Sequence, residues 1–272
     1  MKKKSFLSIL TSDNYILGLI VLYYSLLKTK TKYPFLVLLT PNISSKTLSI
    51  LNTHSIQYKI LETEILNPTN VNKAHRWFRT YSKINIFNQI QFDKIVYLDV
   101  DMLVLKNIDS LFDKPHLSAT IDGDPLIKNN SNKKRINSGL LVFEPSRELF
   151  NDMSNKIGKI ENLTYTGTFD RPKSGSDQDF LNAYYPEWGE KKDLHLDPRY
   201  NIFFYQLDQY KKCFPKKCST HYWPFIIHYA SFKKPWDFIE SKESISPFIY
   251  VNNNLESRAI KLWIDFLKEL KI

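Results

Sequence analysis

The chain has 272 residues, of which 43% are hydrophobic and 14% aromatic, and it contains only 7 glycines, a composition that excludes a disordered or linker-rich protein. Its 38 basic and 28 acidic residues give a formal net charge of +10, but the lysines are scattered in short runs without a basic helix, zinc finger or aromatic RNA-binding motif, so nucleic acid is not expected as a partner. The length suits one large α/β domain or two modest ones, and no repeat or low-complexity linker divides it.

The first half of the chain alternates between strand-like and helix-like stretches. Residues 5–10 form a buried apolar run, Asp13 or Asn14 can cap a helix, and residues 15–28 have the composition of a helix with its basic end last. This alternation predicts a Rossmann-like, mostly parallel sheet with flanking helices, which binds ligands beyond the carboxyl ends of its strands. The other elements predicted in this half are strands at 35–40, 57–61 and 94–99 and helices at 44–53 and 76–89.

The strand at 94–99 delivers two carboxylates, Asp99 and Asp101, to the point where it should reach the surface. Alternate residues of an extended strand share a face, so both carboxylates can point at one ion while Val100 turns away. Hard oxygen ligands of this kind suit Mg²⁺ or Mn²⁺. A strand that ends in a solvated acidic turn would have the same pattern, so the D-x-D pair alone leaves both interpretations open.

Three further polar blocks occur in the second half. The corner Asn137-Ser138-Gly139 leads into another apolar strand, and Asp177 lies in the first turn of a predicted helix. A later strand runs into a loop that carries His228, two lysines and Trp236. Taken singly, each block also fits an ordinary turn, a helix cap or a packed core residue.

Cys213 and Cys218 lie in a lysine-rich loop with no second pair to complete a zinc site, and we interpret them as free thiols in a reducing compartment. The apolar run at 6–10 is too short for a signal peptide, and that at 15–27 is too short to cross a bilayer. We therefore expect a cytoplasmic protein with no transmembrane segment.

The last stretch, residues 255–272, has the apolar periodicity of an amphipathic helix. Core packing or a homodimer contact is favoured for it over membrane binding. The apolar face predicted for this helix consists of Leu255, Ala259, Ile260, Trp263, Phe266, Leu267 and Leu270.

In order and spacing, five blocks of this chain resemble glycosyltransferase family 8, in the compact form of its glycogenin-like members. The blocks are SILTSDNY at 8–15, YLDVDMLVL at 97–105, NSG at 137–139, DQDFLN at 177–182 and HYASFKKPW at 228–236. The resemblance implies a GT-A type glycosyltransferase fold in a single domain at 1–272, with a nucleotide-binding half at 1–110, a sugar and acceptor half at 111–240 and a helical segment at 241–272. It also implies a retaining enzyme that uses a UDP-sugar.

The resemblance assigns a metal and diphosphate set. Asp99, Asp101 and His228 match the family residues that hold Mn²⁺, for which Mg²⁺ is the alternative. Lys234 matches the lysine that contacts the donor diphosphate. This chain has Ser231 where the family block has a glycine, so the backbone contact expected there is less well defined.

The resemblance also assigns donor-binding residues. It places Leu10, Thr11 and Tyr15 around the uracil and Val100 at the ribose. Lys83 matches a lysine near the donor sugar and phosphate, with Arg76 and Arg79 as alternatives for that duty. The matches for the sugar-facing set are Asp122, Asn137, Asp177 and Gln178, and Ser138 of the NSG block is a further cofactor-binding match.

The mechanism that the resemblance implies retains anomeric configuration. Lys234 and the metal would take up charge on the leaving UDP, while Gln178, with Asp177 beside it, would lie against the opposite face of the sugar. Because glutamine is a poor nucleophile, same-face attack by the acceptor is favoured over a covalent glycosyl enzyme.

The sequence is compatible with more than one donor sugar and more than one acceptor. Glucose is the favoured hexose, with UDP-galactose or a UDP-N-acetylhexosamine as alternative donors. The acceptor is a glycan, a protein or one of the chain's own tyrosines, for which Tyr200, Tyr205 and Tyr210 are candidates. The alternative class is a non-catalytic sugar-nucleotide or glycan-binding protein that has kept the fold.

Overall fold

The computed structural model describes residues 3–68, 78–123, 134–159, 175–213, 224–240 and 254–271. A six-stranded sheet in the order β3-β2-β1-β4-β7-β6 forms its centre. The strands are β1 (Lys4–Leu10), β2 (Phe35–Leu39), β3 (Gln57–Ile60), β4 (Lys94–Leu98), β6 (Ser118–Ile121) and β7 (Ile136–Phe143).

The central sheet is mixed. The pairings from β3 through β2 and β1 to β4 are parallel, which confirms the mainly parallel sheet expected from the sequence. β7 runs antiparallel to both β4 and β6, a feature that the alternation in the first half of the chain did not predict.

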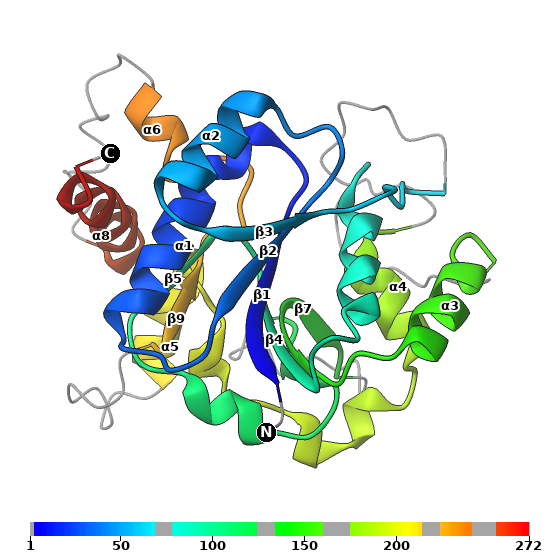
Figure 1. The fold of residues 1–272 in the computed structure, drawn as a ribbon. Helices are drawn as coiled ribbons and strands as arrows, with labels where there is room; N and C mark the ends of the chain where they lie inside the picture. Colours follow the sequence, from blue (N-terminus) through cyan, green and yellow to red (C-terminus); the bar gives the residue numbers. More distant parts are fainter. Residues whose placement is uncertain are drawn as a thin grey trace.

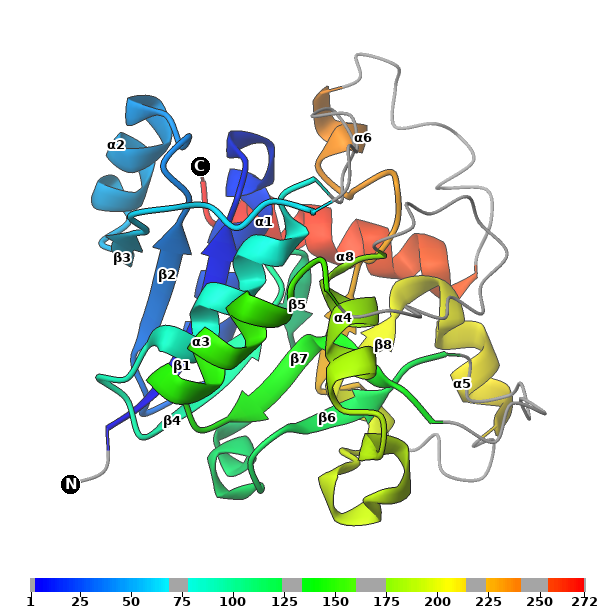
Figure 2. The same ribbon diagram turned by 90° about the vertical axis from the view of Figure 1, so that its right-hand side faces the viewer.

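Helices cover both faces of this sheet (Figure 1). On one side lie α1 (Ile16–Lys28) and, packed beside it, the terminal helix α8 (Leu255–Glu269). On the other lie α3 (Arg147–Lys156), α4 (Asp177–Tyr184) and the 3-10 helix η2 (Thr80–Asn88). In Figure 2, α3 and α4 lie in front of the sheet and α8 behind it. The remaining longer helices are α2 (Ser45–Thr53) and α5 (Leu207–Cys213).

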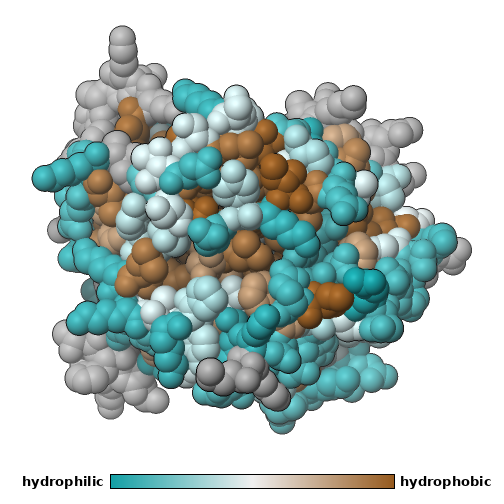
Figure 3. Space-filling view, in the orientation of Figure 1, coloured by the Kyte–Doolittle hydropathy of each residue, from teal (hydrophilic) through white to brown (hydrophobic). Residues whose placement is uncertain are grey.

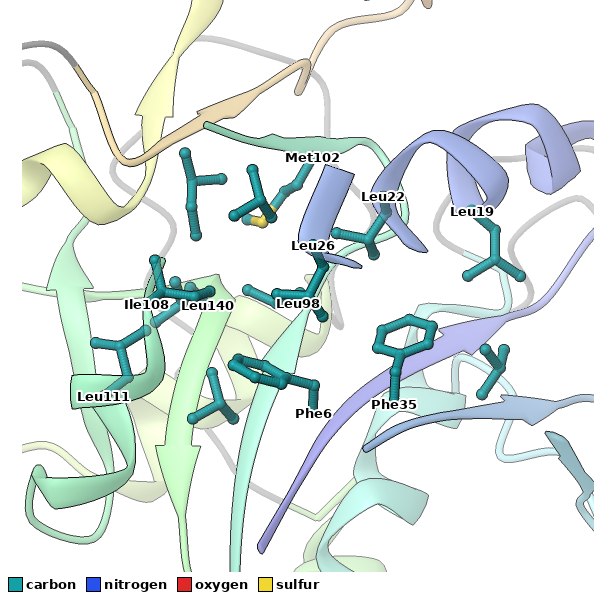
Figure 4. Packing of buried hydrophobic residues seen from close by; sticks show 14 of the residues in the cluster. Phe6, Leu19, Leu22, Leu26, Phe35, Leu98, Met102, Ile108, Leu111 and Leu140 are labelled. Atoms are coloured by element: carbon teal, nitrogen blue, oxygen red, sulfur yellow. The ribbon is translucent and has the colours of Figure 1, made fainter. Parts of the chain in front are cut away.

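Each face of the sheet has its own hydrophobic cluster, because neighbouring residues of a strand point to opposite sides. Phe6 packs toward α1, whereas Leu7 packs toward η2 and α4. Figure 4 shows the first cluster, in which Leu98 and Leu140 of the sheet lie near Leu26 of α1. Burial on both faces explains why β1 is a continuous apolar run rather than an alternating one.

A second, three-stranded sheet in the order β5-β9-β8 lies beside the first. It consists of β5 (Met102–Val104), β9 (Ile226–His228) and β8 (Ile202–Phe203). α8 packs against this sheet and α1 through Trp263, which confirms the predicted helix and its core-packing role. Ile264 is also buried there and was missing from the predicted apolar face, whereas Phe266 and Leu270 are only half-buried.

The helix starts follow side-chain caps. Ser44, Ser146 and Asn254 each accept a hydrogen bond from a backbone N–H in the first turn of α2, α3 and α8. The cap predicted at Asp13 or Asn14 is wrong. Ser12 caps a short 3-10 turn, η1 (Asp13–Tyr15), that precedes α1, and the carboxylate of Asp13 instead accepts from the backbone N–H of Ser44 at 3.1 Å.

Two further expectations need correction. The helix expected at 76–89 is a 3-10 helix from Thr80 to Asn88 in the described part of the chain, since its β-branched, serine and asparagine residues are weak α-helix formers. The block Asn137-Ser138-Gly139 is not a corner before a strand but lies inside β7 and is buried. Arg76, Cys218 and the side chain of Cys213 lie outside the described residues.

Among the described residues, no helix is both long enough and apolar enough to span a membrane. On the face shown in Figure 3, apolar residues lie in small groups between hydrophilic ones. The exposed apolar side chains include Phe232, at 77% exposure, in the loop after β9.

Candidate functional site

Two carboxylates and an imidazole meet between the two sheets. Asp99 follows β4, and Asp101 immediately precedes β5. β5 pairs antiparallel with β9, and the partner of Met102 in this pairing is His228. Because of this register, one ligand atom from each of Asp99, Asp101 and His228 lies within 4.8 Å of the others. His228 Nε2 lies 3.1 Å from Asp101 Oδ1 and 3.9 Å from Asp99 Oδ2.

Each carboxylate has a lysine of its own. Lys234 Nζ lies 2.5 Å from Asp101 Oδ2 and also donates to the carbonyl of Tyr229 at 3.0 Å. Lys83, a buried residue of η2, lies 3.1 Å from Asp99 Oδ1 and 2.8 Å from Asp177 Oδ2. The site therefore combines alternating positive and negative groups, which is an arrangement suited to a polyanionic ligand and a cation.

The pKa values of the two carboxylates are shifted in opposite directions. Burial raises the pKa of Asp99, and the nearby Lys83 offsets only part of this effect. Burial would also raise the pKa of Asp101, but Lys234 and His228 outweigh it and hold that pKa below its ordinary value. Burial would lower the pKa of Lys234, but Asp101 raises it. Lys83 behaves in the same way, because Asp177 and Asp99 raise its pKa against the effect of burial.

The first turn of α4 presents Asp177 and Gln178 to the site. Ser176 caps α4 in a capping box with Asp179, whose other oxygen binds Arg135 at 2.8 Å. Asp179 is thus a structural cap. Asp177, in contrast, accepts from the hydroxyl of Ser138 at 2.9 Å and from Lys83.

The side chain of Gln178 is held at both ends. Its Oε1 accepts from the backbone N–H of Ser138 at 3.1 Å, and its Nε2 donates to Asp122 Oδ2 at 2.9 Å. Asn137 donates to the other oxygen of Asp122 at 3.1 Å. The structure therefore brings together the whole sugar-facing set expected from the resemblance, which is Asp122, Asn137, Asp177 and Gln178, and places Ser138 in contact with the last two.

Of the residues expected around the uracil and the ribose, some lie at the site and others are described by contacts elsewhere in the fold. Tyr15 lies close to the site, with its ring 5.8 Å from Lys234 Nζ and 5.6 Å from the ring of Trp236. Val100 is half-buried in the turn between the two carboxylates. The side chain of Leu10 is in the core, and its carbonyl accepts from Thr40. The carbonyl of Thr11 accepts from Asn42.

Two other expected residues have local partners. Ser231 donates from its hydroxyl to the carbonyl of Lys233, within the loop that carries Lys234. Arg79 forms an ion pair with Glu64. Of the three basic residues considered for the donor phosphate, Lys83 is the one placed at the carboxylates, Arg79 pairs elsewhere, and Arg76 lies outside the described residues.

The three candidate tyrosines lie in different surroundings. Tyr200 stacks on Phe225, with ring centroids 4.6 Å apart, and Tyr210 packs against the cluster around α8. Tyr205 is 44% exposed and stacks on Phe203, whose ring centroid is 5.3 Å from that of His228. Tyr205 is therefore separated from the imidazole by a single aromatic ring.

Two residues of the site were missed in the sequence. Tyr97 donates to Asp99 Oδ1 at 2.6 Å, and the strand alternation that pairs Asp99 with Asp101 would have placed Tyr97 on the same face. Asn201 lies 2.8 Å from His228 Nδ1 and precedes the two-residue strand β8, where no local pattern distinguishes it.

Comparisons with known proteins give a consistent result. The sequence model of the family described as Glycosyl transferase family 8 matches residues 6–240. Inositol phosphorylceramide glucuronosyltransferase 1 of Arabidopsis thaliana is 33% identical over 187 residues, which are 68% of this chain and 31% of that protein. Glycogenin-1 of Homo sapiens is 29% identical over 244 residues, which are 88% of this chain and 63% of that protein. The chain thus spans less than two thirds of the length of either relative.

Among solved structures, the galactosyltransferase LgtC in complex with donor and acceptor sugar analogues superimposes with a TM-score of 0.64. The match covers 97% of this chain and 95% of that chain at 18% sequence identity. This likeness confirms the expected GT-A type fold.

Proposed function

The chain belongs to glycosyl transferase family 8, and we propose that it is a metal-dependent retaining enzyme that transfers a hexose from a UDP-sugar to a hydroxyl acceptor. The observation that carries the proposal is the convergence of Asp99, Asp101 and His228 with two buried or half-buried lysines. A protein that only bound glycans would have little use for a potential cation site flanked by two further positive charges.

The residues present fit a divalent cation. Two carboxylates and an imidazole are ligands that Mn²⁺ accepts, with Mg²⁺ as the harder alternative. Asn201 holds the far nitrogen of His228, so Nε2 faces the carboxylates, as expected for a metal-binding histidine. Asp99, Asp101 and His228 would hold the cation. Once bound, it would supply Lewis-acid stabilisation of negative charge on the leaving diphosphate.

The protein's own positive charges would share this task. Lys234 lies on a loop, adjoins both Asp101 and Tyr15, and is half-buried. Its ammonium group would neutralise a diphosphate oxygen when the bond to the sugar breaks. Lys83 would hold Asp177 and Asp99 in place, because its ammonium group already connects the two carboxylates.

The sugar would lie against the network around Asp122. Asp122 directly follows β6, Asn137 lies in the neighbouring strand β7, and Gln178 comes from α4. Carboxylate and amide groups are suited to recognise sugar hydroxyls, and a site built to hydrogen-bond a hydroxyl discriminates strongly against sugars that lack it. This network supports a hexose as the transferred group.

The surroundings of Asp177 and Gln178 support same-face attack by the acceptor. Asp177 Oδ2 is bound by both Lys83 and Ser138, which makes it a weak nucleophile, and both ends of the Gln178 amide are held. We therefore infer that neither forms a bond to the sugar. The acceptor hydroxyl would lose its proton to an oxygen of the departing phosphate.

For the donor we propose UDP-glucose, on the likeness to glycogenin-1 over 88% of the chain. The names of the other relatives indicate glucuronosyl and galactosyl transfer by those proteins, so UDP-glucuronate and UDP-galactose belong in the same screen, together with UDP-N-acetylhexosamines. For the acceptor we propose a sugar or protein hydroxyl, with Tyr205, the exposed one of the three tyrosines considered, as the candidate within this chain.

A donor screen tests the proposed function. UDP release is measured for each UDP-sugar with Mn²⁺, with Asp101→Ala as the control variant. Turnover of one UDP-sugar that requires Mn²⁺ and is lost in Asp101→Ala supports a metal-dependent transferase. Failure to turn over any UDP-sugar, with or without added acceptors, would instead support the non-catalytic sugar-nucleotide or glycan-binding class.

A further inference from the structure

A chain of buried hydrogen bonds connects the sugar-facing network to the imidazole of His228. Asn137 Nδ2 donates to Asp122 Oδ1 at 3.1 Å, and Asn201 Nδ2 lies 2.8 Å from Asn137 Oδ1. Asn201 Oδ1 lies 2.8 Å from His228 Nδ1. Asn137, Asn201 and His228 are 4%, 7% and 4% exposed, so water has little access to replace these bonds.

The donor and acceptor of each hydrogen bond between Asp122 and His228 follow from the carboxylate of Asp122 at one end of the series. A carboxylate such as Asp122 can only accept, so the amide NH₂ of Asn137 must face it. Asn137 then turns its oxygen toward Asn201, where that oxygen accepts from the Asn201 NH₂ and from the backbone N–H of Gly139 at 2.9 Å. Asn201 is left with only its oxygen for His228. The nitrogen that this oxygen faces, Nδ1, must therefore carry the proton.

We propose that Asn201 is a positioning residue that keeps the proton of neutral His228 on Nδ1 and so turns the lone pair of Nε2 toward Asp99 and Asp101. This inference rests on the proposed function, because that lone pair would serve a metal ion. Asp122, a residue of the sugar-facing network, sets the direction of this series of hydrogen bonds. The same carboxylate would therefore orient both the sugar and the metal-binding histidine.

The position of the imidazole supports a fixed ring. A Cβ atom at Gly139 would lie 2.6 Å from His228 Cε1 and 3.0 Å from Nδ1, so the backbone of β7 packs directly against the ring. Without Asn201, the nearest hydrogen-bond partner of the ring would be Asp101 Oδ1, 3.1 Å from Nε2. The proton would then move to Nε2 and block the lone pair. Metal-bound histidines commonly need such an outer partner, whose loss weakens metal binding by about 10-fold to 100-fold.

The test reads the tautomer directly. Long-range ¹H–¹⁵N spectra of the metal-free protein, recorded at about pH 9, above the ordinary pKa of histidine, show which ring nitrogen carries the proton, and His228→Gln assigns the signal. We expect Nδ1–H in the wild type and in Asn201→Asp, which keeps an acceptor oxygen. We expect Nε2–H in Asn201→Ala. The control Thr120→Val removes another hydrogen bond of the Asn201 amide, at 3.1 Å, without interrupting the chain, and should keep Nδ1–H.

Mn²⁺ titration, followed by the EPR signal of the free ion, gives the second readout. Asn201→Ala should bind Mn²⁺ at least about 10-fold more weakly than the wild type, and Asn201→Asp should remain within about 3-fold. Nε2–H in the wild type, or a tautomer unchanged in Asn201→Ala, overturns the proposal, as does an equal loss of affinity in Thr120→Val. A wild type that binds no Mn²⁺ overturns the proposed metal site instead, while the spectra still decide the role of Asn201.

Discussion

The ammonium group of Lys83 lies 2.8 Å from the carboxylate of Asp177 and so joins the 3-10 helix η2 to the first turn of α4. The same group lies 3.1 Å from Asp99 at the end of β4. One buried lysine therefore connects the candidate metal site to the residues that face the sugar. Its removal would leave the buried carboxylate of Asp177 and the half-buried carboxylate of Asp99 without their cation.

Lys83→Met should lower the free energy of unfolding by about 3–5 kcal/mol, because breaking a buried ion pair leaves uncompensated charge. Guanidinium unfolding measures the change. Lys28→Met is the matched control, since Lys28 pairs with Glu269 at the surface, where both side chains are more than 60% exposed, and such pairs contribute about 1 kcal/mol or less. Equal effects of the two substitutions would show that Lys83 is not an essential counter-charge.

Gly139→Ala should weaken Mn²⁺ binding by about 10-fold or more, because the added Cβ would lie 2.6 Å from His228 Cε1 and displace the ring. Affinity is measured by Mn²⁺ titration and stability by thermal unfolding. Gly189→Ala is the control, because a Cβ there would crowd the carbonyl of Lys134 and not the imidazole. It should reduce stability and keep the Mn²⁺ affinity. Wild-type affinity in Gly139→Ala would contradict the packing argument.

Lys234→Met should lower kcat by about 100-fold to 1,000-fold, as removal of a single charge-stabilising donor commonly does. Mn²⁺ affinity should not fall, because the substitution also removes a cation from Asp101 Oδ2. Steady-state kinetics with the donor found in the screen and Mn²⁺ titration provide the two measurements. Lys233 is an exposed lysine of the same loop, and Lys233→Met should change neither kcat nor Mn²⁺ affinity appreciably. A loss in kcat shared by the two variants would indicate general loop disruption.

The two carboxylates should have opposite effects on the pH dependence of stability. The pKa of Asp101 is lowered, so its contribution is complete above its ordinary value of 3.8 and is lost as pH falls through its folded value. The pKa of Asp99 is raised, so its contribution is present at low pH and is lost as pH rises through its folded value.

Relative to the wild type, therefore, Asp101→Asn should become less stable, and Asp99→Asn more stable, as pH rises from about 3 to about 7. Urea unfolding at a series of pH values measures both trends in metal-free protein. Trends of the same sign in the two variants would show that Lys234 does not distinguish the carboxylates.

No glycosyl adduct should form on Asp177 during turnover, since its Oδ2 is bound by Lys83 and Ser138. Peptide mass spectrometry of enzyme quenched during turnover with a slow donor analogue tests this expectation. Asp177→Asn serves as the comparison, because it cannot form the ester. An adduct on Asp177 in the wild type that is missing from the variant would favour double displacement.

Much of this molecule could be predicted from local sequence. The strands β1, β2 and β4 can be recognised from their continuous apolar runs, and α8 from the helical periodicity of its apolar residues, because burial requires apolar side chains at these positions. The D-x-D pair could be located from its spacing after an apolar strand, although its two carboxylates flank a turn between β4 and β5 and do not share a strand face. The later blocks identified Asp177, His228 and their neighbours through the family resemblance.

The sequence by itself therefore determined six of the strands (β1 to β4, β7 and β9), the helices α1, α2, α4 and α8, and the residue types of the site. Only the tertiary structure decided that β7 runs antiparallel between β4 and β6, that Ser138 lies inside it, and that Asn201 faces His228. These features depend on pairing between segments far apart in the chain, and a strand buried on both faces, such as β7, has no alternation of apolar and polar residues that would specify its register. Asn201 is the clearest example: nothing near it in the sequence distinguishes it, and its role arises from the pairing of β8 with β9 and from its contacts with Asn137 and His228.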